Sequence, residues 1–138
     1  MDDRPTAVEL LQAVREFLER ELVPGVEDRG LRYQALIALS VLGIVEREIP
    51  GRDGRLRAEL HALDDLLGRP RADRPIEAGE LPALVGEASR ELCRRIRAGA
   101  ADDGPWRERV VVHVRTVVEE KLGISDPERL RTFTRKDR

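Results

Sequence analysis

The sequence predicts an all-α, single-domain bundle of about five helices that ends in a short C-terminal helical turn. Apolar residues recur along the chain at the three- and four-residue spacing of a helix face. The chain has 138 residues, enough for one hydrophobic core. Hydrophobic residues make up 41% of it and aromatic residues only 3%, so leucine, valine, isoleucine and alanine must build that core. We assign residues 1–131 to the bundle domain and residues 132–138 to a basic, frayed tail.

The first helix is predicted from a capping box. Thr6 is placed to cap the helix, and Glu9 lies three residues later, so that each side chain can satisfy the other's backbone N–H. Apolar residues then recur at helical spacing as far as Leu22, and Pro24-Gly25 ends the helix.

The second helix is predicted over residues 29–49. Between residues 35 and 45 its apolar side chains cover more than one face, which predicts that this helix is enclosed by the others at the centre of the domain. That stretch is about half of the roughly 20 residues that a membrane span requires. We therefore expect a core helix and no membrane association.

The third helix carries the leucine stripe Leu56, Leu60, Leu63 and Leu67 and should end at Gly68 in a left-handed cap. The segment 69–75 has two prolines and alternating charges, as expected of a long connection. The pattern predicts that this connection divides the chain into a three-helix half and a two-helix half.

Two further helices follow. The fourth, over residues 81–98, is predicted to turn six side chains inward: Leu81, Leu84, Val85, Ala88, Leu92 and Ile96. The fifth begins near Pro105, and its many valines favour a strand on propensity. It is about 18 residues long and has no second strand to pair with, so we predict a helix. Asp126 should cap the last helical turn.

Charge and cysteine content bound the possible partners and location. The 25 basic and 27 acidic residues nearly cancel, so nucleic acid is not an expected partner. The lone Cys93 excludes an internal disulfide and is expected to be buried in a structural role. The chain begins Met-Asp-Asp-Arg, which lacks the basic and apolar run of a signal peptide, and we expect a cytoplasmic protein.

The sequence contains no catalytic constellation. His61 and His113 lack the spacing of metal ligands, and the glycines form no phosphate-binding loop, so we predict no metal and no cofactor. His113 falls on the apolar stripe of the fifth helix, which favours a core or interface histidine over a catalytic base. The basic cluster Arg90, Arg94, Arg95 and Arg97 is consistent with a solvated helix face or with contacts to a phosphate, CoA or an acidic partner.

Several blocks in fixed order resemble a known family. They are residues 3–11, 38–48 and 96–99, followed by His113, Thr116-Val117, Lys121-Leu122 and Asp126-Pro127. The chain is similar to a small bacterial family of unknown function whose genes lie beside acyl-CoA dehydrogenases and aminoglycoside-phosphotransferase-like kinases. It departs from the family pattern at Ser40 and Asp126, where the family has asparagine.

The resemblance implies a non-catalytic accessory subunit of such a kinase, which phosphorylates a hydroxyacyl-CoA in acyl-CoA catabolism. The kinase would supply nucleotide, Mg²⁺ and catalytic base. Matched positions imply that Arg47, Arg97, His113 and Lys121 face the partner or the CoA phosphates. Two alternatives stay open, a free-standing helical homodimer with a structural or regulatory role and a small enzyme that uses His113 as a base.

Overall fold

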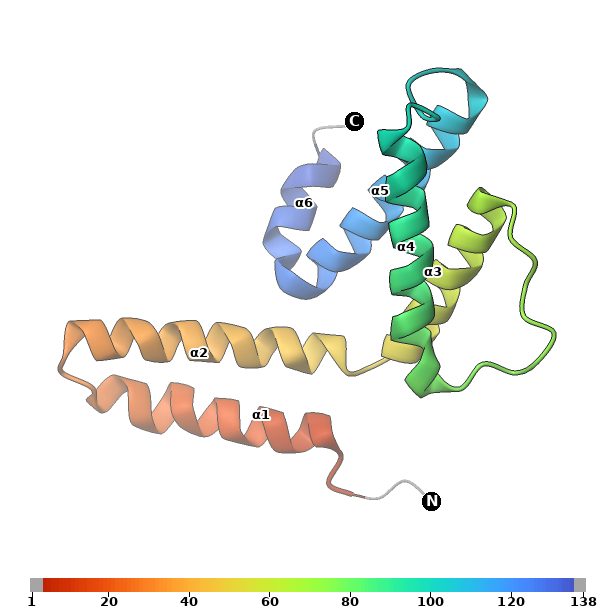
Figure 1. Ribbon diagram of the computed structural model, residues 1–138. Coiled ribbons are helices and arrows are strands. Elements are labelled where there is room, and N and C mark those ends of the chain that lie inside the picture. The colour runs from red at the N-terminus through yellow and green to blue at the C-terminus, as the bar shows by residue number, and fades with distance from the viewer. Residues whose placement is uncertain (1–3, 136–138) are drawn as a thin grey trace. The chain divides into compact units, whose positions relative to one another are not determined.

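The computed structural model describes residues 4–135, which form helices and connecting turns with no strand among them (Figure 1). The predicted all-α fold is confirmed. The chain divides into two compact units. The first extends to Pro50 and includes Ile124–Asp126, and the second comprises Gly51–Gly123 and the chain from Pro127 onward.

The first unit opens with α1 (Ala7–Phe17). Its capping box is confirmed, because the Thr6 N–H donates to Glu9 Oε2 (2.7 Å) and the Glu9 N–H donates to Thr6 Oγ1 (3.2 Å). The helical path continues through a π-helical segment (Leu18–Leu22) and one 3₁₀ turn (Val23–Gly25). The helix therefore ends at the predicted Pro24-Gly25, after a change of pitch that its apolar periodicity did not predict.

Helix α2 (Arg29–Glu48) returns beside α1, so that the two form a helical hairpin (Figure 1). Asp28 caps α2 by accepting a hydrogen bond from the Leu31 N–H (2.6 Å). Across the hairpin, Arg15 Nε donates to Glu46 Oε1 (2.7 Å). This bond fixes the register of the two helices.

The prediction that α2 is the centre of the domain is wrong. Within the described part of the first unit only Val23 and Gly43 are buried, and large apolar side chains on both helices are exposed. An apolar helix is enclosed only where neighbouring helices cover its faces, and α1 covers one face of α2. Within the first unit, α1 leaves the second apolar face of α2 uncovered.

The core lies in the second unit, where α3 (Arg52–Leu67) packs on α4 (Leu81–Arg97). A 3₁₀ turn (Ala78–Glu80) leads into α4, and α5 (Gly104–Ser125) adds one buried residue. The buried cluster consists of Leu60, Leu63, Leu66, Leu67, Leu81, Val85, Ala88, Leu92 and Val110. The predicted inward stripes of α3 and α4 are largely confirmed; Ile96 is exposed instead.

The segment between α3 and α4 is irregular, as predicted, but it does not divide the chain. The boundary between the compact units falls at Pro50 and Gly51. The connection is held within the second unit because Arg57 Nη2 donates to the Ile76 carbonyl (3.1 Å) and Ile76 packs against the core. The predicted division at residues 69–75 is therefore wrong.

Two predictions concern the C-terminal part of the chain, namely the helical state of the valine-rich segment and the extent of the last helix. The valine-rich segment is helical, as predicted, because α5 continues without interruption to Ser125. Helix α6 (Pro127–Arg135) is longer than a single turn and includes residues 132–135 of the segment assigned to the tail. Residues 136–138 lie outside the described part of the chain.

Candidate functional site

Three side chains attach the end of α3 to α4 and α5. The backbone carbonyls of a helix's last turn have no partner within the helix. Here Arg95 Nη1 donates to the Leu67 carbonyl (3.1 Å), Trp106 Nε1 to the Leu66 carbonyl (3.0 Å) and Arg109 Nη2 to the Asp65 carbonyl (2.9 Å). The bonds from Trp106 and Arg109 hold α5 beside α3, and the bond from Arg95 holds α4 there.

The carbonyl before these three is satisfied by the predicted cap. Gly68 has a left-handed φ of 67°, and the Arg69 N–H donates to the Asp64 carbonyl (2.8 Å). The Asp64 side chain is buried and forms an ion pair with Arg69 (3.4 Å). These bonds hold the C-terminal end of α3 in place beside the groove that lies between α3 and α5.

An open groove of about 480 Å³ lies between α3 and α5. Its walls are Ala62, Asp65 and Leu66 from α3 and Glu108, Arg109, Val112, His113 and Thr116 from α5. A second open hollow, of about 730 Å³, lies at the start of α5 and shares Glu108 and Val112 with the groove. The two hollows are therefore neighbours along α5, with Glu108 and Val112 between them.

His113 is the titratable ring in the groove. It is partly buried, and this burial lowers the pKa of its imidazole below 6.5; the charges of Glu59 and Glu120 oppose the shift. The ring is therefore neutral at pH 7, with one nitrogen able to accept a proton. Among the side chains that the structure describes, those of residues 4–132 and 134, none orients the ring through a hydrogen bond, unlike the partner of the imidazole in a catalytic triad.

Three of the other polar residues of the groove, Asp65, Arg109 and Thr116, form bonds within the protein, and Glu108 is exposed. The Asp65 carboxylate binds Arg71 (3.1 Å), and Arg109 donates to a backbone carbonyl. Thr116 Oγ1 donates to the Val112 carbonyl (3.0 Å). The groove thus combines apolar side chains with a polar rim in which Asp65, Arg109 and Thr116 are held by bonds within the protein.

Helix α5 also has an exposed apolar surface beside the groove. One side of α5 packs against the rest of the second unit and carries Trp106, Val110, His113 and Val117. Another group of valines is exposed. That group is Val111, Val112, Val114 and Val118. Val112 is 64% exposed and lines both hollows, so it is the most accessible apolar side chain of this surface.

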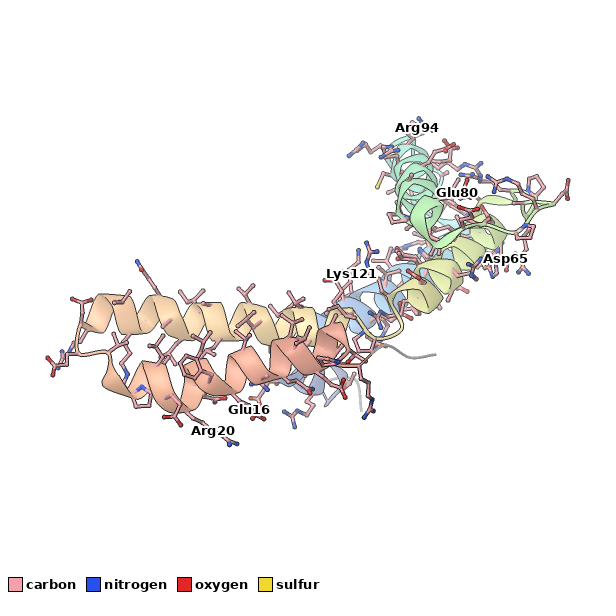
Figure 2. All side chains as sticks on the ribbon, turned by 90° about the horizontal axis from the view of Figure 1, so that it is seen from below. Glu16, Arg20, Asp65, Glu80, Arg94 and Lys121 are labelled. Carbon is pink, nitrogen blue, oxygen red and sulfur yellow. The ribbon has the colours of Figure 1, made fainter. Side chains whose placement is uncertain are left out.

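The four residues implied by the resemblance do not share one pocket. Of the four, only His113 lines the groove. Lys121 lies two turns further along α5, and Arg97 is exposed at the end of α4. Figure 2 shows Lys121 extending from α5. Arg47 belongs to the first unit, where its Nε donates to the Ile124 carbonyl (2.7 Å).

Two of the four arginines in the basic cluster of α4 form internal bonds. Arg94 and Arg95 both bind Glu91. The hydrogen bond from Arg94, and to a smaller extent that from Arg95, holds the pKa of the Glu91 carboxyl below its usual value. Arg94 lies at the exposed end of α4 (Figure 2). Cys93 is exposed, so its predicted burial is wrong. It follows the buried Leu92 and is rotated about 100° away from the core.

The groove was missed at the sequence level, although its pattern was present. Arg109, Val112, His113 and Thr116 follow the spacing i, i+3, i+4 and i+7, which places them on one face of a helix. Ala62, Asp65 and Leu66 do the same on α3. What the sequence lacks is any signal that these two faces lie side by side.

Residues 4–135 thus form a strand-free helical protein with an open groove between α3 and α5. Among those residues no three His, Cys, Asp or Glu side chains gather to hold a metal ion, and no helix is long and apolar enough to cross a membrane. The chain belongs to the family described as Domain of unknown function (DUF6285), whose model matches residues 24–129. No curated protein and no solved structure matches it.

Proposed function

We propose that this protein is a non-catalytic accessory subunit of an aminoglycoside-phosphotransferase-like kinase that acts on a hydroxyacyl-CoA in acyl-CoA catabolism. The observation that carries the binding role is the pair of open hollows along α5 together with the exposed valines beside them. Exposed apolar surface with a polar rim is typical of protein–protein interfaces. The kinase and its substrate are proposed from the family resemblance.

This division of labour assigns the chemistry to the kinase. The kinase supplies nucleotide, Mg²⁺ and catalytic base, while this protein stabilises it or completes its acyl-CoA pocket. The apolar side chains of the groove, and the bonds that hold Asp65, Arg109 and Thr116 on its rim, support a surface that binds without reacting. Arg47, Arg97, His113 and Lys121 are the proposed contacts to the partner or to the CoA phosphates.

Reconstitution with the purified kinase tests this proposal. The readout is ATP-dependent phosphorylation of a hydroxyacyl-CoA, followed by mass spectrometry, with binding measured by calorimetry. Val112→Glu places a charge at the centre of the α5 surface and should weaken binding at least tenfold. Leu10→Glu, at a comparably exposed position on α1, is the matched control and should bind as the wild type does. Equal kinase activity with and without the protein contradicts the proposal.

Charge reversal tests the electrostatic contacts separately. Arg97 is exposed and its side chain is not required by the core, so Arg97→Glu should leave the fold intact. Under the proposal it weakens partner binding, and the loss is greater at low salt because charged contacts between exposed groups are screened by ions. Unchanged affinity and activity remove Arg97 from the interface.

A second candidate is a small enzyme that uses His113 as a base. It is favoured by the neutral imidazole in the groove, since active sites collect residues with shifted pKa values. The protein alone would then convert a hydroxyacyl-CoA, and His113→Asn would abolish turnover while leaving ligand binding in place. Absence of turnover by the isolated protein rejects this candidate and leaves the accessory role standing.

A further inference from the structure

The inward stripe of the first helix does not continue to the residue that its spacing predicts. Leu11, Arg15 and Leu18 are partly buried and follow the alternating four- and three-residue spacing of one helix face. The next member of this series is Leu22, which is 49% exposed. Val23 takes its place in the interior of the hairpin and is only 5% exposed.

The π-helical segment causes this displacement by one position. Its closing hydrogen bond runs from the Val23 N–H to the Leu18 carbonyl, five residues earlier. In an α-helix the same N–H would donate to the Glu19 carbonyl, four residues earlier. The turn therefore contains one residue more than an α-helical turn, and the chain that follows is displaced by about 100° around the helix axis. This displacement brings Val23 to the position that Leu22 would otherwise occupy.

Pro24 gives a physical reason for the wider turn. Proline has no N–H, and within an α-helix its ring clashes with the carbonyl of the residue four positions earlier, which here is Arg20. An α-helical path through residue 24 is therefore disfavoured. Apart from this clash the two paths are closely matched, because each one buries a single aliphatic side chain, Leu22 or Val23, at the same place.

We propose that residues 18–24 form a conformational switch between two helical registers. In the π-helical register of the structure, Val23 is buried and Leu22 faces solvent. In the α-helical register, the Val23 N–H donates to the Glu19 carbonyl, Leu22 is buried and Val23 turns outward. The exchange replaces one backbone acceptor with its neighbour and changes which aliphatic side chain this end of the hairpin exposes. It goes beyond the proposed function and does not depend on the kinase.

Thiol labelling reports the two registers directly. Leu22→Cys and Val23→Cys are made in the full chain with Cys93→Ser, so that each protein has one thiol, and the rate of reaction with a maleimide is measured. Residue 22 should react at least tenfold faster than residue 23. Adding Pro24→Ala removes the clash, so labelling should slow at residue 22 and quicken at residue 23, each at least fivefold. Gln12→Cys, at an exposed position before the segment, is the matched control and should keep its rate.

The pattern of labelling rates distinguishes a switch from fraying of the helix end. Opposite changes at residues 22 and 23 support the proposal. Faster labelling at both positions shows that Pro24→Ala only loosens the helix end and overturns the proposal, as do rates that stay the same at both. Circular dichroism checks that each variant keeps the helical content of the wild type.

A double-variant cycle tests the switch with Pro24 in place. Leu22→Ser should leave the protection of the α1 and α2 amides against hydrogen exchange nearly unchanged, because Leu22 is exposed in the π-helical register. The loss of protection in Val23→Ser is limited, because Leu22 can replace Val23 in the other register. The double variant should then lose at least fivefold more protection than the product of the two single effects. A loss equal to that product or smaller contradicts a second register.

Discussion

The indole Nε1 of Trp106 on α5 donates a hydrogen bond to the Leu66 carbonyl near the end of α3, over 3.0 Å. The two residues are 40 positions apart in the chain. The bond gives a partner to a helix-end carbonyl that its own helix cannot satisfy, and it sets where α5 crosses α3. The groove between these helices depends on it.

Trp106→Phe should lower the free energy of unfolding of the second unit by about 1–3 kcal/mol. The substitution keeps an aromatic ring but leaves the partly buried Leu66 carbonyl without its donor. Urea denaturation followed by circular dichroism measures the change. Arg107→Gln, one position along on the exposed side, is the control and should change stability by less than about 0.5 kcal/mol. Equal stability of the two variants contradicts the assigned role of the bond.

Leu63→Ala should cost about 2–5 kcal/mol, because the Leu63 side chain is 0% exposed at the centre of the α3–α4 core and its loss leaves a cavity. The same truncation at the exposed Leu36 of α2 removes no contact with that core. Denaturation midpoints of the two variants therefore separate the core from the open face. A loss as large at Leu36 as at Leu63 would show that α2 belongs to the same core after all.

The pH dependence of His113 follows from its burial. Its pKa is lowered in the folded state, so between that value and 6.5 the unfolded chain binds more protons than the folded one. The neutral His113 ring therefore makes its full contribution to the stability of the folded state above pH 6.5. That contribution declines as the pH falls below 6.5. A proton NMR titration should give a pKa for His113 below 6.5, and His113→Gln should reduce the acid-side loss of stability. His61→Gln should retain that loss.

Glu80 provides a test in strong acid. A hydrogen bond from Arg74 (2.8 Å), with a second from the Glu77 N–H (3.1 Å), lowers the pKa of the Glu80 carboxyl to about 2. The stabilisation that the charged Glu80 carboxylate gains from these bonds is present above pH 4.5 and is lost as the pH falls through about 2. Carboxyl NMR shifts measure this titration. Arg74→Gln should raise the pKa of Glu80, whereas Arg71→Gln, which affects the Asp65 pair instead, should not.

Thr6→Ala should destabilise α1 by about 1 kcal/mol, because the Glu9 N–H loses its cap. The hairpin contains few buried residues, so its amides should exchange with solvent faster than those of α3 and α4. Hydrogen exchange measures both effects. Faster exchange confined to α1 and its neighbour α2 supports the assignment, and uniform acceleration along the chain contradicts it.

The local features of the fold could be predicted from the sequence because they depend on neighbours within a few residues. The Thr6–Glu9 capping box and the left-handed Gly68 are fixed by local geometry, and the leucine spacing of α3 is fixed by the helical repeat. The helical state of the valine-rich α5 followed from the lack of a second strand. Of the groove, the sequence marked His113 as a candidate site residue and Thr116 as part of a family-like block, but not the residues of α3 that face them.

By itself, then, the sequence determined that the chain is helical, where most helices begin and end, and which faces are apolar. Only the tertiary structure decided which apolar faces are covered: α3 and α4 bury theirs, whereas α2 keeps Ile37 exposed although its composition is just as apolar. The hydrophobic effect is non-directional and does not specify a partner. Partners are set by long-range bonds such as that between Trp106 and Leu66, which join residues that no local pattern relates.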